Sequence, residues 1–216
     1  MNVGTLVVAV SATALLGTLP VSAQTTVDDF KSGSYSVAIR SGQDVNVQAG
    51  AMMGSYRYTR IIVGDEAANP RGGAGVLDIM EGSDPEHGYF VVSGGYQVYP
   101  RIELFYGVDA LGQNAPLHKN LAALGDRLRL HFDGSDGTLN VNFVVFTDGA
   151  YAIHGYNLPP NHQPFTQDFN FADFEGNGVD WTNIDYIVLV VQSTFGSEDW
   201  ALTKIEIAQP QLDPIG

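Results

Sequence analysis

The chain has 216 residues and a formal net charge of −14 at pH 7, with 44% hydrophobic and 16% charged residues. This length and apolar content indicate one domain with a sizeable core. The acidic balance repels phosphate backbones and anionic membrane surfaces, which excludes nucleic acid as a partner. No cysteine is present, and an exported protein that rests on its core without disulfides points to bacteria more than to animal secretion.

Residues 1–23 carry no charged side chain and contain apolar runs at 6–10 and 14–16. Pro20 ends the second run, and Val21-Ser22-Ala23 has the small-x-small pattern of a signal-peptidase site. The runs are shorter than the roughly 20 residues that span a bilayer, and no second hydrophobic segment follows. We therefore expect a cleaved secretory signal peptide at 1–23, a single domain at 24–216 without a membrane span, and a periplasmic or extracellular location. A retained leader stays open, since no Lys or Arg precedes the apolar run.

Apolar and polar residues alternate with a period of two over most of the remaining chain, which is typical of strands with one buried face. These runs cover 34–40, 44–48, 96–106, 127–132, 139–145, 165–171 and 201–207. The unbroken apolar run 187–191 predicts a central strand buried on both sides. The Asp-Gly turn at 133–137 predicts a hairpin between the strands that flank it.

The predicted fold is therefore all-β, an antiparallel β-sandwich or jelly roll with at most one short helix. That helix is expected at 116–124, where Pro116 opens it and Gly125 closes it.

One set of polar side chains falls on the non-core face of the predicted strands. Sugars are bound by amide, guanidinium and carboxylate groups that pair with hydroxyls and by aromatic rings that cover the apolar side of the sugar ring. The candidate ligand-binding residues are Tyr99, Arg101, Glu103, Arg127, Arg129, His131, Asn140 and Asn142. They form one surface if the run 96–106 lies in the same sheet as the predicted hairpin. The alternative is a solvated outer face, with Arg101 and Glu103 as a surface ion pair.

Acidic residues flank the first and last predicted strands of the domain. Asp28 and Asp29 open the first strand, and Asp199 precedes the last. Because these strands often lie side by side in a sandwich, the three carboxylates are the candidate ligands of one calcium ion.

The closing segment carries a further pattern: Phe169-x-Phe-x-x-Phe174, then 179–191, then 200–207. It resembles the C-terminal half of galactose-binding-like jelly-roll domains, a group that includes many carbohydrate-binding modules, and Val27-Asp-Asp-Phe30 resembles their opening. The resemblance implies a structural calcium near the first and last strands, where Asp28, Asp29 and Asp199 fall. Lys204 departs from the family pattern, which has an asparagine or aspartate before the final isoleucine.

No common catalytic signature is present: the sequence lacks a G-x-S-x-G elbow, an H-E-x-x-H motif, a phosphate-binding glycine loop and a cysteine nucleophile. The leading hypothesis is a secreted, non-catalytic carbohydrate-binding module that takes a neutral glycan or polysaccharide, with calcium as a stabilising ion. Two alternatives remain open. One is a structural surface or filament-forming envelope protein, and the other is a jelly-roll polysaccharide-cleaving enzyme, because catalytic triads are recognised by geometry rather than by order.

Overall fold

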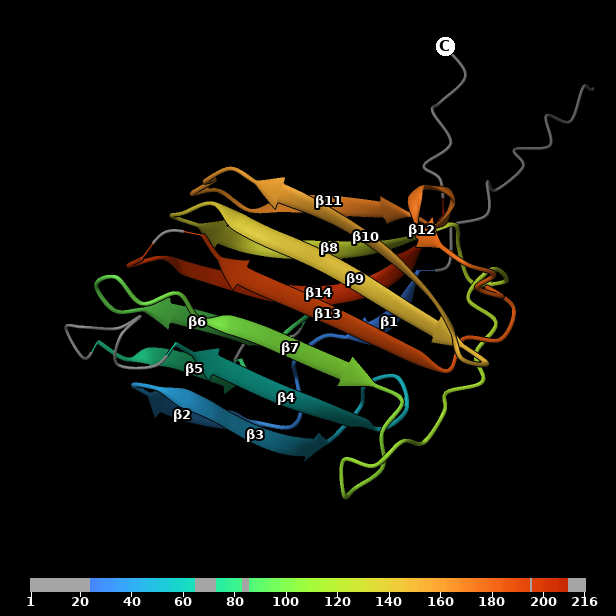
Figure 1. The fold of residues 1–216 in the computed structure, drawn as a ribbon, viewed down its shortest axis with the longest axis horizontal. Helices are drawn as coiled ribbons and strands as arrows, with labels where there is room; N and C mark the ends of the chain where they lie inside the picture. The colour runs from blue at the N-terminus through green and yellow to red at the C-terminus, as the bar shows by residue number, and fades with distance from the viewer. Residues whose placement is uncertain (1–23, 65–72, 83–85, 195, 210–216) are drawn as a thin grey trace, which may run out of the picture.

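The computed structural model describes residues 24–64, 73–82, 86–194 and 196–209, which form a sandwich of two antiparallel seven-stranded sheets (Figure 1). The predicted all-β sandwich is confirmed. Sheet A contains, in spatial order, β11 (Phe165–Asn170), β8 (Arg127–Ser135), β14 (Asp199–Ala208), β6 (Tyr89–Gly94), β5 (Gly75–Met80) and β2 (Tyr35–Ile39), with β1 (Thr25–Asp28) paired to β14. Sheet B contains β12 (Glu175–Gly176), β10 (Ala150–Leu158), β9 (Leu139–Thr147), β13 (Tyr186–Ser193), β7 (Arg101–Tyr106), β4 (Tyr56–Val63) and β3 (Gly42–Ala49). The expected leader lies outside the described residues.

The core lies between the two sheets, because alternation along each strand turns one set of apolar side chains inward. Phe143 of sheet B meets Phe169 of sheet A edge-on, with ring centroids 4.9 Å apart. In sheet A, Trp200 is 2% exposed and stacks on Phe90. The apolar run 187–191 is indeed part of the central strand of sheet B, β13, where Val188 is buried even on the outer side.

The predicted hairpin at 127–145 is wrong, because β8 belongs to sheet A and β9 to sheet B. The segment between them crosses from one sheet to the other. Its backbone hydrogen bonds go to distant segments: Ser135 exchanges N–H···O bonds with Asn161, and Asp136 N–H donates to Asp199 O at 3.0 Å. Gly137 lies against Glu198, whose Cγ would be 2.1 Å from an added Cβ. These long-range contacts hold the crossover in place of a hairpin.

The helix expected at 116–124 is absent, and the one helix in the described residues is the short 3₁₀ helix η1 (Phe171–Asp173). The segment is mostly extended because its backbone bonds to residues 181–185. Lys119 forms an isolated antiparallel β-bridge with Ile184, and Leu121 N–H donates to Trp181 O at 2.9 Å. A single turn follows, where Gly125 N–H reaches Leu121 O. In the part of the chain described, no helix is long and apolar enough to cross a membrane.

Candidate functional site

The crossover between β8 and β9 divides the eight predicted ligand-binding residues between two opposite faces of the molecule. Arg127, Arg129 and His131 lie on the outer face of sheet A, on β8. Asn140 and Asn142 lie on the outer face of sheet B, together with Tyr99, Arg101 and Glu103. Packed sheets are about 10 Å apart, so the structure does not bring the eight residues into one site.

The outer face of sheet A carries a closed network of charges. Asp168 accepts hydrogen bonds from Arg129, with Nε at 2.5 Å and Nη2 at 2.9 Å, and from Arg127 at 2.9 Å. The bond from Arg129 is the main reason that the pKa of Asp168 is lowered. Fully buried Glu206 contacts His131 Nε2 at 3.0 Å and Lys204 Nζ at 2.5 Å. Because Asp168 and Glu206 already have arginine and lysine partners, a ligand would have to displace existing ion pairs.

The outer face of sheet B presents a row of polar side chains that crosses six strands. Strand register places these residues side by side, and we call them the polar row: Asn157, Asn140, Gln192, Arg101, Ile62 and Gln43, with Ile62 as its one apolar member. At the usual strand spacing the row is about 24 Å long. It is therefore long enough for an oligomeric ligand that lies across the strands.

The asparagines at one end of the polar row are linked to each other. Asn142 Nδ2 donates to Asn140 Oδ1 at 2.6 Å, and Asn140 Nδ2 donates to Asn157 Oδ1 at 2.9 Å. Asn142 lies over Gly155 of the neighbouring strand, where an added Cβ would be 2.0 Å from Asn142 Oδ1. The glycine thus leaves room for the amide chain, which holds three planar side chains in fixed positions.

A second row, next to the polar row, contains Gly155, Asn142, Val190, Glu103, Arg60 and Val45. Glu103 is 2% exposed although it points to the outer face. Arg60 Nε donates to its Oε2 at 2.7 Å, and Arg101 Nη2 lies 2.7 Å from its Oε1. Both carboxylate oxygens are therefore engaged, and Glu103 positions the two guanidinium groups.

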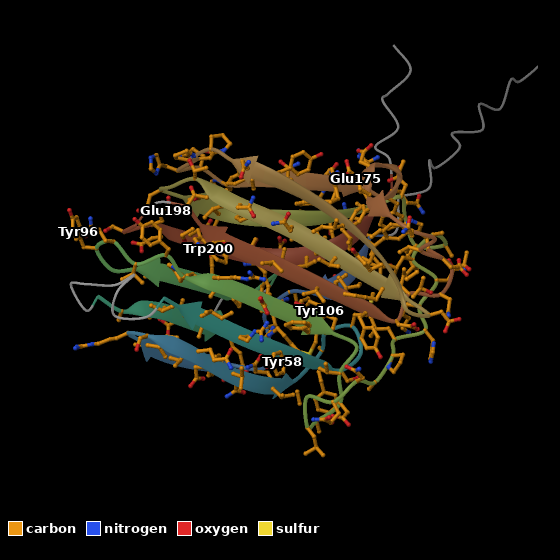
Figure 2. All side chains as sticks on the ribbon, viewed as in Figure 1. Tyr58, Tyr96, Tyr106, Glu175, Glu198 and Trp200 are labelled. Atoms are coloured by element: carbon orange, nitrogen blue, oxygen red, sulfur yellow. The ribbon has the colours of Figure 1, made fainter. Side chains whose placement is uncertain are left out.

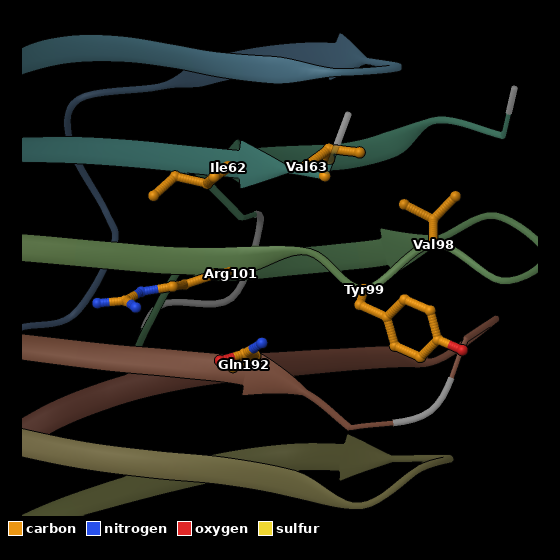
Figure 3. Close-up of a pocket in the computed structure, with 7 residues that line it drawn as sticks. Ile62, Val63, Val98, Tyr99, Arg101 and Gln192 are labelled. Carbon is orange, nitrogen blue, oxygen red and sulfur yellow. The ribbon is translucent and has the colours of Figure 1, made fainter. Parts of the chain in front are cut away.

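A hollow of ≈ 410 Å³ opens at the middle of the polar row (Figure 3). Its lining residues are Ile62, Val63, Gly64, Val98, Tyr99, Arg101 and Gln192. Figure 3 shows Ile62, Arg101 and Gln192 on three neighbouring strands, with the Tyr99 ring to one side of them and the Arg101 side chain extending away from that ring. Tyr99 is 42% exposed and lies just before β7, because Pro100 separates the turn at 95–98 from the strand.

Donors and acceptors in this hollow remain available to a ligand. Within the described part of the chain, the side-chain amide of Gln192 has no hydrogen-bond partner, and the polar contact of the Arg101 side chain is its ion pair with Glu103, in which Nη2 lies 2.7 Å from Oε1. An exposed aromatic ring, an amide and a guanidinium group around one depression can pair with hydroxyl groups and cover an apolar ring face.

The opposite end of the same face is apolar and aromatic. Tyr58 and Phe105 meet edge-on at 5.2 Å, and Tyr151 is 56% exposed. In Figure 2 the labelled Tyr58 lies well away from Tyr96, which stands at one end of the sandwich. The outer face of sheet B is thus divided into a polar and an aromatic half.

The three predicted calcium ligands do not meet. Strand β1 does pair with β14, but Asp28 stands opposite Ile205, six residues beyond Asp199, which is roughly 20 Å of strand. Asp28 is buried and bound to Arg57 Nη1 at 2.6 Å and to Tyr106 Oη at 2.8 Å. The positive charge that balances its carboxylate is therefore the guanidinium group of Arg57. Asp29 accepts from Lys31 N–H. Within the described ranges, no group of three or more His, Asp or Glu side chains has the arrangement of a metal site.

Sequence reasoning missed several residues of the site, among them Gln192, Ile62 and Arg60. On β13, Gln192 is two residues from Val190 and four from Val188, so all three side chains point to the outer face. The apolar run before Gln192, however, predicts a strand that is buried on both sides. Ile62 and Arg60 lie in a strand without clear alternation in polarity, since β4 reads Tyr-Arg-Tyr-Thr-Arg-Ile-Ile-Val. Arg57 is a charged residue on the buried inner face, so the alternation of buried and outer positions along β4 does not appear as an alternation of apolar and polar residues.

Comparison with known proteins gives structural matches to carbohydrate-binding modules. The family 11 module of the cellulosomal cellulase Lic26A-Cel5E of Clostridium thermocellum aligns at 10% identity and a TM-score of 0.42 over 88% of this chain and 98% of that chain. CBM28, a module specific for non-crystalline cellulose, aligns at 13% identity and 0.36, covering 62% and 81%. TmCBM61, in complex with β-1,4-galactotriose, aligns at 9% identity and 0.29, covering 78% and 90%. No protein-family model and no curated protein matches the sequence. The likeness concerns the arrangement of strands.

Proposed function

We propose that this chain is a non-catalytic carbohydrate-binding module that takes a polysaccharide across the polar row of sheet B. One observation carries the proposal: planar polar side chains with unused hydrogen-bonding groups line a hollow beside the exposed ring of Tyr99. Sugar recognition needs this combination of hydroxyl-pairing groups and an aromatic face. The length of the row, about 24 Å, favours a polysaccharide over a monosaccharide.

The state of Glu103 favours binding over hydrolysis. A glycosidase of the usual kind needs two carboxyl groups roughly 5 to 10 Å apart, one of which transfers a proton. Glu103 is the only carboxylate of the two rows, and both of its oxygens are held by Arg60 and Arg101. It is therefore engaged in positioning these arginines.

Affinity electrophoresis through gels that contain soluble glucans, xylans, mannans and galactans tests the proposal, and isothermal titration with matching oligosaccharides gives the dissociation constant. We expect retardation by at least one polymer. Tyr99→Ala should weaken that binding by about tenfold, since this corresponds to about 1.4 kcal/mol, which is the upper part of the range for an aromatic contact.

Tyr151→Ala is the matched control, because Tyr151 is an exposed tyrosine of the same sheet at its aromatic end. Thr166→Ala tests the outer face of sheet A, where Thr166 is exposed on β11. Both variants should bind as the wild type does. Equal losses in all three variants, or no binding to any polysaccharide, would refute the proposed site.

Export from the cytoplasm is part of the proposal and rests on the charge-free leader and its small-x-small pattern. Mass spectrometry of the protein from its native host should find an N-terminus at Gln24. An intact leader would instead favour an anchored or assembling protein.

A further inference from the structure

We infer that the glycan bound by the polar row carries isolated carboxylate groups, as uronate units on an otherwise neutral chain, and that Arg101 binds the carboxylate. This inference rests on the proposed function and adds a charge requirement to it. Three features lead to it: the local charge of the two rows, the unused donors of Arg101, and the strongly acidic remainder of the protein.

The two rows across sheet B hold an excess of positive charge. Their twelve positions, all described, include two arginines and one glutamate, which leaves one positive charge. A single arginine would neutralise Glu103, yet both Arg60 and Arg101 contact it. The chain as a whole carries −14, so this small positive surface contrasts with the rest of the molecule.

Arg101 is the member of the pair that a ligand can reach. Its side chain is 46% exposed, against 31% for Arg60, and it lines the same hollow as Tyr99 and Gln192. Nη2 is the nitrogen of Arg101 nearest to Glu103, and within the described residues Nε and Nη1 donate no hydrogen bond. A guanidinium group that is fixed on one side and open on the other is suited to a planar carboxylate, which accepts two parallel hydrogen bonds.

The remaining positions of the polar row favour sparse rather than continuous charge. Asn157, Asn140 and Gln192 are neutral, so they pair with hydroxyl groups rather than with further carboxylates. A polymer with a carboxylate on each sugar would also meet the repulsion of the whole protein, which salt screens only beyond about 8 Å at physiological ionic strength. One uronate among neutral sugars fits one open arginine among amides.

Glucuronoxylan and the same preparation after chemical reduction of its carboxyl groups provide the test, because the two polymers share backbone and linkage and differ in charge. We expect the acidic polymer to bind at least about tenfold more tightly. This preference should fall as sodium chloride is raised. Polygalacturonate, with a carboxylate on each unit, should bind no more tightly than glucuronoxylan.

Arg101→Gln keeps a planar amide and removes the charge, so the affinity ratio of acidic to reduced polymer should fall towards one. Arg101→Lys should retain part of the ratio, since it keeps the charge but not the fork. Arg127→Gln, on the outer face of sheet A, is the matched control and should leave the ratio unchanged. Urea unfolding of each variant shows whether a change in affinity reflects a change in stability.

The outcomes separate the inference from the proposed function. Binding of the reduced polymer as tight as that of the acidic one refutes the uronate preference and leaves carbohydrate binding standing. A preference that survives in Arg101→Gln, or tighter binding of polygalacturonate, also overturns the inference. If the protein binds neither these polymers nor any neutral polysaccharide, the proposed function and the inference fail together.

Discussion

A buried ion pair joins the two sheets, and its removal should be costly. Asp28 on β1 of sheet A is 1% exposed, and Arg57 on β4 of sheet B is fully buried. Besides Asp28, the guanidinium group donates to Gly33 O at 2.8 Å and to Gln48 Oε1 at 3.0 Å. Asp28 also accepts a hydrogen bond from the hydroxyl of Tyr106 on β7. The pKa of Tyr106 is raised well above its usual value, mainly by burial and then by the charge of Asp28.

Asp28→Ala removes the carboxylate that, among the described residues, pairs with Arg57, and it leaves a buried positive charge without this counter-ion. Breaking a buried pair in this way costs about 3–5 kcal/mol, a large part of the roughly 5–15 kcal/mol that stabilises a typical domain. The double variant Asp28→Ala with Arg57→Met removes both charges. It should be more stable than Asp28→Ala alone, because the unpaired guanidinium group is gone.

Urea unfolding monitored by tryptophan fluorescence measures both effects. Trp200 is buried and stacks on Phe90, which in turn packs against Phe30, two residues from Asp28. The midpoint should shift while the slope m stays constant. If Asp28→Ala costs less than about 1 kcal/mol, or if the double variant loses the sum of the two single losses, the pair does not stabilise the sandwich as argued.

Three further predictions concern other parts of the molecule. The bonds from Arg129 and Arg127 lower the folded-state pKa of Asp168, so its contribution to stability is present above the unfolded pKa near pH 4 and is lost as the pH falls through the folded value. Asp168→Asn should therefore flatten the decline in stability below about pH 4, measured by chemical unfolding over a pH series; an unchanged decline would contradict the assignment. Gly155→Ala places a Cβ 2.0 Å from Asn142 Oδ1 and should weaken polysaccharide binding in affinity electrophoresis, whereas Gly134→Ala, whose Cβ has no neighbour nearer than 3.4 Å, should not; equal affinities in both variants would separate the amide chain from the site. Because Asp28 is bound to Arg57 and Asp199 lies at the other end of β14, Asp199→Asn should not alter the response of the melting temperature to calcium or to a chelator, and a calcium shift lost in this variant would show a site there.

The polar row shows which parts of the site were accessible to sequence reasoning. Alternation along the chain predicts that Tyr99, Arg101 and Glu103 point to one face. In the structure Tyr99 and Arg101 line the same hollow, although β7 begins only after Pro100. Asn140 and Asn142 were likewise placed on the outer side of their strand, where they lie. The face to which a side chain points is a local property of an extended chain, because successive side chains point to opposite faces. A pattern of a few residues is therefore enough to reveal it.

Which strands share a sheet was decided only by the tertiary structure. Arg127 and Asn140 are close in sequence, and the pattern around them predicts a hairpin. In the structure β8 instead pairs with β14 and β11, and β9 pairs with β13 and β10. An Asp-Gly turn between two alternating runs is compatible with a hairpin and with a crossover between sheets. Contacts of the turn with residues 161 and 199, far along the chain, select the crossover.

The sequence by itself therefore determined an all-β chain, its acidic balance, and the inward or outward direction of most side chains, because alternation and composition are local quantities. The tertiary structure decided which outward-facing residues become neighbours. It separated the arginines of β8 from the asparagines of β9 and placed Gln192 between Asn140 and Arg101. It also gave Asp28 a guanidinium partner. These neighbours come from strands distant in sequence, and their pairing follows from the packing of the whole sandwich.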